Sequence, residues 1–355
     1  MIKTPTLLID EQKCKSNIKM MYDRASNQHV ELRPHFKTHQ SLEIGRWFNE
    51  VGVKKITVSS LTMARYFSDE WDDILVAFPT NINEIDTINE LAHKTRLHLN
   101  IENLESITFL AKHLKSSVSV YIQIDAGYHR TGVDPSNVKL INQILRVIDD
   151  SDRMSFVGFY AHSGHTYQCR NAEDIKRIHT STLQIMSGLS KHFPFAKIAL
   201  GDTPSCSVAE DFSGIDELCP GNFVFYDLMQ HQIGSCDISQ IAVAMACPIV
   251  AIHKDRLELV IYGGGVHFSK ERLGDVEGTI YGRVAEKTNS GWGNLIQDMF
   301  VKGLSQEHGI VSAPLDLIDN YQIGDHLLVL PVHSCMTANL MGGYNTLDDK
   351  VISMA

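Results

Sequence analysis

The sequence predicts an α/β fold in which a (β/α)8 TIM-type barrel is followed by a C-terminal β domain. In the first two-thirds of the chain, short β-rich runs alternate with amphipathic segments at helical spacing, which is the pattern of βαβ units and a parallel sheet. After about residue 237 the runs are strand-like and joined by turns with little helical pattern, which indicates a separate β domain. We expect domains at 12–236 and 237–355, with residues 1–11 packing on the second domain.

Eight β-rich runs precede that change, and this number fits a closed (β/α)8 barrel better than an open doubly wound sheet. The runs are Leu32–Lys37, Lys55–Ser59, Asp73–Phe78, Arg96–Ile101, Val118–Asp125, Phe156–His162, Lys197–Asp202 and Leu218–Phe223. The amphipathic segments between most of them are Gln40–Glu50, Ile82–Lys94, Leu104–Leu114, Asn137–Asp149 and Glu173–Lys191. The strand-like runs of the second domain are Ile241–Ile252, Leu257–Ile261, Gly278–Val284, His308–Val311 and His326–Pro331.

Composition and charge favour a globular protein and argue against several classes of partner. The 355 residues are 43% hydrophobic and 21% charged, which is enough apolar material for one large domain and a smaller one. The net charge of −10 argues against a nucleic acid or an acidic membrane as partner. The start lacks a signal-peptide pattern, and the longest apolar stretch, 238–252, is interrupted and too short to span a bilayer. Seven cysteines without a CxxC pair argue against a disulfide framework, so we expect a cytoplasmic protein.

The first predicted barrel strand has an unusual basic face. On a period of two, the residues that share one side are Arg33, His35, Lys37 and His39. In a barrel this side points inward, where a lysine is costly unless it is paired or reactive. Low polarity lowers the pKa of a lysine toward the free amine that carbonyl chemistry needs. A solvated basic edge strand is the alternative for this segment alone.

The loops after the seventh and eighth runs are candidate phosphate contacts. Thr203 follows the seventh run in Gly-Asp-Thr-Pro-Ser, and Gly221 and Asn222 lie in the eighth. Barrel enzymes often bind phosphate with these two loops, because glycine permits close backbone approach and hydroxyls donate hydrogen bonds. Taken as turn chemistry alone, both segments are ordinary.

Aromatic and imidazole side chains gather near the predicted barrel mouth. Tyr160 and His162 share one face of the sixth run, and His165 and Tyr167 follow in the loop. Arg130 follows the fifth run and can pair with an anionic oxygen. Such a set can stack on a flat cofactor, although each residue alone is more often structural.

A possible metal pair lies in the second domain. His333 and Cys335 end a hydrophobic run and are two residues apart, so on a strand their side chains project to the same side. Zinc accepts both ligands, and an incomplete protein shell leaves positions for water or substrate. Two ligands alone are a weak pattern, since a buried Cys beside a half-exposed His is the commoner explanation.

These segments together resemble the fold-type III pyridoxal-phosphate enzymes, specifically the D-serine dehydratase and D-threonine aldolase family. The resemblance runs nearly from end to end through TPTLLID, RPHFKTHQ, DAGYHRTGV, YAHSGHTY, GDTPS, CPGNFVFYD, LSQEHG and PVHSCMTANL, in this order. It implies an alanine racemase-like barrel and a β domain. Alanine racemases carry an Arg before the Pro-Gly of the eighth strand, whereas this chain has Cys219, which argues against racemase-like tuning of the cofactor ring.

By this resemblance, Lys37 would carry pyridoxal 5'-phosphate as a Schiff base and would act as base for the α-proton. The other residues expected to contact the cofactor are Arg130, Tyr160, His162, Tyr167, Thr203, Gly221 and Asn222. His333 and Cys335 would hold a divalent metal, and the soft thiolate favours Zn²⁺ over Mn²⁺.

The resemblance implies a lyase acting on small 3-hydroxy D-amino acids, in the first place a zinc-dependent D-serine dehydratase that forms pyruvate and ammonia. The His-x-Cys pair is similar to that of the dehydratases, whereas the aldolases more often show His-x-Asp. Retro-aldol cleavage to glycine and an aldehyde is the alternative, with His165 as a candidate base. A pyridoxal-phosphate carrier without activity is a third hypothesis, although such relatives consist of a single barrel. The family also implies a homodimer.

Overall fold

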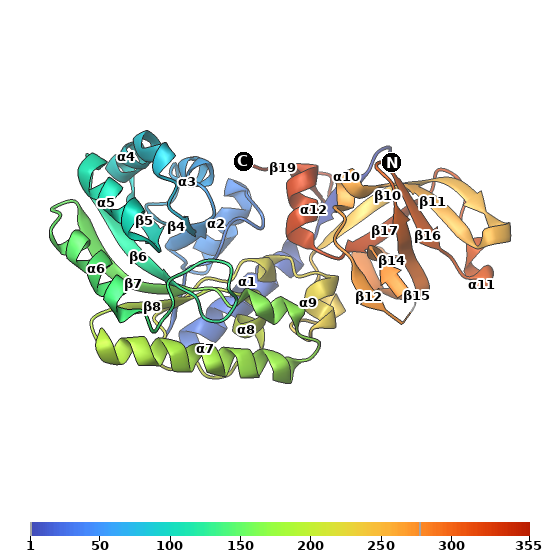
Figure 1. Cartoon of the computed structure of the whole chain (residues 1–355). Helices are drawn as coiled ribbons and strands as arrows, with labels where there is room; N and C mark the ends of the chain where they lie inside the picture. Colours follow the sequence, from blue (N-terminus) through green and yellow to red (C-terminus); the bar gives the residue numbers. More distant parts are fainter. Residues whose placement is uncertain (1, 277) are drawn as a thin grey trace. The chain divides into compact units, whose positions relative to one another are not determined.

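The computed structural model describes residues 2–276 and 278–355 and separates into two compact units (Figure 1). Lys19–Gly221, with the terminal Ala355, form what we call the barrel unit. The N-terminal segment through Ile18 and Asn222–Met354 form what we call the β unit. Helix α1 (Glu11–Asn27) contributes residues to both.

The barrel unit contains an eight-stranded parallel sheet that is nearly closed. Its strands are β2 (Glu31–Leu32), β3 (Lys55–Val58), β4 (Asp73–Pro79), β5 (Arg96–Ile101), β6 (Val118–Ile124), β7 (Met154–Ala161), β8 (Lys197–Leu200) and β9 (Glu217–Leu218). Their order is β2-β9-β8-β7-β6-β5-β4-β3, and an isolated parallel bridge between His35 and Thr57 joins the two ends. Each of the eight predicted runs overlaps one of these strands, so the predicted barrel is confirmed.

Helices lie outside the barrel strands (Figure 1). They are α2 (Leu42–Glu50), α3 (Leu61–Phe67), α4 (Ile85–Lys94), α5 (Leu104–His113), α6 (Val138–Asp149), α7 (Ala172–His192) and the short α8 (Thr203–Val208). In α6 the residues Ile141, Ile144, Leu145 and Ile148 recur at helical spacing and are all buried. Asn137 begins this helix because its side chain accepts a hydrogen bond from the Leu140 backbone N–H at 3.1 Å. The sequence pattern did not predict α1, α3 or α8.

The first predicted strand differs from expectation in its second half. The regular ladder covers only β2, and residues 36–39 form a turn directly after the bridge at His35. Phe36 packs with its ring centroid 5.0 Å from that of Phe48, and His39 lies on the same side, 4.4 Å from Phe36. The prediction that His39 shares the basic face is therefore wrong, because a turn removes the alternation on which it rested.

The β unit is built on a nine-stranded mixed sheet. Its strands are β1 (Thr6–Ile9), β10 (Val243–His253), β11 (Glu258–Tyr262), β14 (Gly282–Thr288), β15 (Gly291–Leu304), β16 (His308–Ser312), β17 (His326–Pro331), β18 (Gly343–Thr346) and β19 (Val351–Ser353). The order is β11-β16-β15-β14-β17-β10-β1-β18-β19, with a further pairing of β10 and β11. Strand β1 pairs antiparallel with β10, so the first residues of the chain complete this sheet.

Shorter elements accompany the sheet. They are the hairpin β12 (Leu273–Asp275) and β13 (Gly278–Ile280), and the helices α9 (Leu228–Gln232), α10 (Gly265–Phe268), α11 (Leu315–Ile318) and α12 (Ser334–Met341). The five runs predicted for the second domain all overlap observed strands, whereas β15, β18 and α12 were not predicted.

Candidate active site

Lys37 lies in the turn that follows β2, where it is exposed between the buried residues Phe36 and Thr38. Phe36 anchors this turn, because its ring packs 5.0 Å from the rings of both Phe67 and Trp71. The backbone N–H of Lys37 lies 3.4 Å from Nδ1 of His35. The amine of Lys37 is thus exposed on a turn whose neighbouring residues, Phe36 and Thr38, are buried.

Two imidazoles near Lys37 are neutral at physiological pH. Burial, followed by the positive charges of Lys37 and Arg130, lowers the pKa of His162 to about 3. Burial, followed by the charge of Lys37, also lowers the pKa of His35 well below its usual value. The Nδ1 atom of His162 is hydrogen-bonded to the carbonyl of Gly201. The barrel mouth therefore combines the basic side chains of Lys37 and Arg130 with uncharged imidazoles, a set that suits an anionic ligand.

Tyr128, which was not among the predicted site residues, contacts several loop residues of the mouth. The guanidinium of Arg130 lies 5.2 Å from the centroid of the Tyr128 ring. His165 stacks on the same ring, with centroids 6.1 Å apart, and His162 meets it edge-on at 6.0 Å. Gly164 makes room for this ring, because a Cβ there would lie 2.3 Å from it. Its place in the DAGYHRTGV motif was the available signal.

Gly221 lies in close contact with the turn after β2 at one of the predicted phosphate loops. A Cβ on Gly221 would lie 2.9 Å from the carbonyl oxygen of His35 and 3.0 Å from Oγ1 of Thr38. Among the described residues, the buried Oγ1 of Thr203 has no hydrogen-bond partner. A buried hydroxyl is normally hydrogen-bonded, so Oγ1 of Thr203 is available to a ligand or a water molecule. Its position in the first turn of α8 is suited to bind a phosphate. These residues fit pyridoxal phosphate.

The two predicted tyrosines occupy different environments within the barrel unit. Tyr160 is buried in a cluster with Leu75, Tyr121 and Cys219, and burial raises the pKa of its phenol. Tyr167 is half-buried in the short 3₁₀ helix 164–168. Both lie at or beyond the carboxyl end of β7, where barrel enzymes place functional groups.

The predicted metal pair lies at the start of a helix in the β unit. Strand β17 ends at Pro331, His333 is the N-cap of α12, and Cys335 lies in its first turn. The prediction that both residues project from one strand is therefore wrong, but the two side chains still meet through a hydrogen bond. Burial disfavours the imidazolium of His333, yet this bond and the charge of Cys335 raise its pKa to about 9.

Other groups complete the surroundings of this pair. The Asn222 side-chain amide lies with Nδ2 3.4 Å from Sγ of Cys335. Within 2–276 and 278–355, no three His, Cys, Asp or Glu side chains are arranged to hold a metal ion together. A soft thiolate next to an imidazole nevertheless suits zinc, with the remaining positions open to other ligands.

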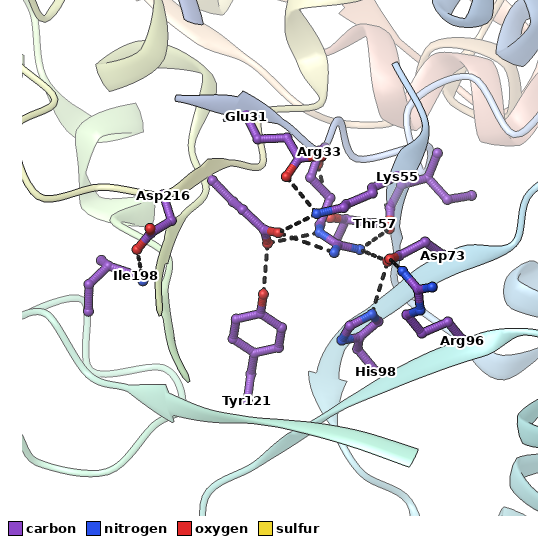
Figure 2. A network of polar contacts seen from close by, with 12 residues as sticks. Glu31, Arg33, Lys55, Thr57, Asp73, Arg96, His98, Tyr121, Ile198 and Asp216 are labelled. Carbon is purple, nitrogen blue, oxygen red and sulfur yellow. Dashed lines mark hydrogen bonds and ion pairs between the residues drawn. The ribbon is translucent and has the colours of Figure 1, made fainter. Parts of the chain in front are cut away.

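A buried ionic network fills one part of the barrel interior and was missed by the sequence analysis (Figure 2). Nη1 of Arg33 lies 2.7 Å from Oδ1 of Asp73, and the guanidinium also pairs with Glu217. Tyr121 donates its hydroxyl proton to Glu217 at 2.8 Å, and His98 lies 2.9 Å from Asp73. No local signal identifies these partners, because they come from strands far apart in the sequence.

Two family models match the chain. The model for "Alanine racemase, N-terminal domain" matches residues 9–228, and the model for "Putative serine dehydratase domain" matches residues 242–347. The first match spans more than half of the chain. The chain belongs to this alanine racemase N-terminal domain family. The resemblance to the fold-type III pyridoxal-phosphate enzymes is thereby confirmed. No helix in the described part of this family member has the length and apolarity to cross a membrane.

Several relatives of this family member align over nearly its whole length. A D-serine dehydratase from Dictyostelium discoideum is 29% identical over 99% of this chain and 95% of its own. A D-threo-3-hydroxyaspartate dehydratase from Delftia sp. is 26% identical over 98% of this chain and 94% of its own. A D-threonine aldolase from Arthrobacter sp. is 22% identical, over 64% of this chain and 62% of its own.

Solved structures of the Delftia dehydratase share the architecture. The enzyme itself superimposes with a TM-score of 0.91 at 25% identity, covering 100% of this chain and 98% of that one. Two of its variants reach a TM-score of 0.92. One variant has a His replaced by Ala, and the other has a Cys two positions later replaced by Ala and is described as metal-free.

Proposed function

We propose that this chain is a pyridoxal-phosphate- and zinc-dependent lyase that converts D-serine to pyruvate and ammonia by β-elimination. The observation that carries the proposal is the hydrogen-bonded pair of His333 and Cys335 at the start of α12. Full-length similarity to two dehydratases of 3-hydroxy D-amino acids supports the same activity. Support for a metal comes from the Delftia variants, in which a His and a Cys with the same spacing were replaced and one variant is metal-free.

The barrel unit, together with Asn222, which directly follows Gly221 in the chain, would hold the cofactor. Lys37 would bind it covalently, while Thr203, Gly221 and the backbone of Asn222 would bind its phosphate. Arg130, Tyr160, His162 and Tyr167 are proposed to position its ring. Bound pyridoxal phosphate supplies an electron sink for negative charge at the substrate Cα, and a bound divalent ion supplies a Lewis acid for the departing hydroxyl.

The protonation states of the mouth support a role for Lys37 in proton transfer. His162 and His35 are kept neutral by burial and by neighbouring cations, so neither readily takes up a proton. The Nζ atom of Lys37 is then the group best suited to remove the α-proton of the substrate. His333 and Cys335 would hold the metal ion that supplies the Lewis acid.

Retro-aldol cleavage to glycine and an aldehyde is the second candidate, favoured by the similarity to D-threonine aldolase. It would need a base for the hydroxyl proton. His165 is a candidate because it is only half-buried, and although burial lowers its pKa, the charge of Asp125 acts in the opposite direction. The thiolate of Cys335 instead of a carboxylate favours the dehydratase.

We further infer zinc in preference to manganese, because a thiolate is a soft ligand. We also propose a homodimer, supported by the family resemblance, and a cytoplasmic location, supported by the cysteine pattern. We propose that residues 12–236 form the domain that binds the cofactor. Residues 237–355 would form the domain that carries the metal pair.

Product analysis by proton NMR tests the proposal. The protein is loaded with pyridoxal phosphate and mixed with D-serine or D-threonine, with zinc in one sample and a chelator in the other. Zinc-dependent pyruvate and 2-oxobutanoate are the expected products. Glycine and acetaldehyde from D-threonine would overturn elimination in favour of the aldolase. Formation of neither set of products would overturn the lyase proposal.

A further inference from the structure

Asn222 lies within hydrogen-bond distance of three groups around the proposed metal pair. Its Nδ2 atom is 2.7 Å from Oδ2 of Asp227, 3.0 Å from Oγ of Ser334 and 3.4 Å from Sγ of Cys335. The Asn222 side chain is 4% exposed. A buried amide with these neighbours has its two hydrogens shared among three acceptors.

The orientation of this amide follows from Asp227. A carboxylate accepts hydrogen bonds only, so the edge of Asn222 that faces Oδ2 of Asp227 must be its NH2 group. The same edge faces the sulfur of Cys335, and the contact is therefore an N–H···S hydrogen bond. Donation to sulfur stabilises a thiolate, the form of cysteine that binds metal.

Asp227 holds the rest of this arrangement together. Its Oδ2 atom accepts hydrogen bonds from the backbone N–H of Ser334 at 3.0 Å and from Oγ of Ser334 at 3.2 Å. Its Oδ1 atom accepts the backbone N–H of Gln230 at 2.9 Å, which makes it the N-cap of α9. One buried carboxylate thus joins the starts of α9 and α12, and the latter carries Cys335.

We propose that Asn222 and Asp227 are positioning residues for the metal thiolate, with Asn222 donating a hydrogen bond to Cys335 and Asp227 fixing Asn222 and the start of α12. This inference rests on the proposed metal role of His333 and Cys335. It assigns the Asn222 side chain to the metal pair, whereas the family resemblance assigned this residue to the cofactor.

The test uses the full-length chain loaded with pyridoxal phosphate, with Co²⁺ replacing Zn²⁺ as a spectroscopic probe. Replacing a group that supports a metal ligand typically weakens metal affinity about 10–100-fold. We expect this loss for Asn222→Ala in competition with a chelator. The thiolate-to-cobalt charge-transfer band should also move to longer wavelength, because the sulfur lone pair loses a stabilising hydrogen bond.

Asn17→Ala is the matched control. Asn17 is also a buried asparagine of the β unit, and its Nδ2 donates to the carbonyls of Val224 and Gln240 at 3.3 and 2.8 Å. The first of these carbonyls lies in the same short 3₁₀ helix as Asn222. Asn17→Ala should leave the band and the metal affinity unchanged.

Several outcomes would overturn the inference. These are an unchanged band and affinity in Asn222→Ala, or equal effects in Asn17→Ala. Should Asn222→Ala fail to accumulate as folded protein, Asp227→Asn repeats the test with a side chain of the same shape. A different result would contradict the metal role of His333 and Cys335 itself. In that case the Cys335→Ala variant would bind cobalt with the same affinity and the same near-ultraviolet band as the unmodified chain.

Discussion

Arg33 and Glu217 form a buried ion pair inside the barrel, with Nε of the guanidinium 2.9 Å from Oε2 of the carboxylate. Both side chains are 1% exposed. Burial disfavours the charged carboxylate, but the charge and hydrogen bond of Arg33, with smaller contributions from Tyr121 and Lys55, together lower the pKa of Glu217. Arg33 also contacts Asp73, so one cation ties the start of β9 to the start of β4. Arg33 lies four residues before Lys37 in the chain, next to the His35–Thr57 bridge where the barrel closes.

Removing the charge of Glu217 should strongly destabilise the barrel unit. The Glu217→Gln change leaves the buried guanidinium of Arg33 with only one of its two carboxylate partners, Asp73. Breaking a buried ion pair costs about 3–5 kcal/mol of unfolding free energy. Urea unfolding measures the loss. Glu90→Gln is the control, since Glu90 pairs with Arg65 at the surface and such pairs contribute about 0–1 kcal/mol. Equal losses in the two variants would contradict the structural role of the network.

His39 should make the protein sensitive to mild acid. Burial lowers its pKa from the ordinary 6.5 to about 3, so between these values the unfolded chain binds a proton that the folded chain does not. Stability is therefore complete above pH 6.5 and falls as the pH drops toward 3, by at most about 1.4 kcal/mol per pH unit for one group. Urea midpoints from neutral to mildly acidic pH measure this slope.

The His39→Asn variant isolates this contribution. Asparagine does not titrate, and its oxygen can accept the backbone N–H of Ser41, which lies 3.1 Å from Nδ1 of His39. We expect a shallower decline of stability with acid, whatever the stability at neutral pH. His93→Asn on the exposed side of α4 should retain the original slope. An unaltered slope in the His39 variant would show that other histidines dominate.

Thr203 should contribute to binding the cofactor phosphate. Its buried Oγ1 has no partner among the described residues, and a hydrogen bond to a charged group is worth about 1.5–3 kcal/mol. The Thr203→Val change keeps the shape and should weaken pyridoxal phosphate binding about 10–100-fold. Titration monitored by absorbance gives the dissociation constant. Thr180→Val on α7 serves as control, and equal affinity for the Thr203 variant and the unmodified protein would refute the contact.

Cys335 should be needed for elimination but not for cofactor binding. It lies in the β unit, whereas Lys37 lies in the barrel unit. Cys335→Ala should therefore abolish formation of 2-oxo acid while leaving the cofactor absorbance intact, and adding a chelator to the unmodified protein should have the same effect. Steady-state product assays and absorption spectra check both statements. Full activity in the variant would rule out the metal role.

Much of the architecture was predictable because its determinants are local. Alternation of side chains in strands and helical spacing in segments such as α6 depend on neighbours within a few residues, so all eight barrel strands could be located. The same rule failed at His39, because a turn after His35 reverses the direction of the side chain. It failed again at Cys335, where a helix starts directly after β17 and brings the thiol to His333 within one turn.

The sequence by itself determined the order of elements and the residue types available for a cofactor and a metal, whereas the exposure of Lys37 in a turn is a finding of the structure. Only the tertiary structure decided that Arg33 meets Glu217, 184 residues later, and that Asn222 meets Cys335, 113 residues later. Hydrogen bonds and ion pairs act over a few ångströms, and nothing in a residue's own neighbourhood specifies a distant partner. Closure of the barrel and the hydrogen bonds of Asp227 to the starts of α9 and α12 supply that proximity, and with it the orientation of each group.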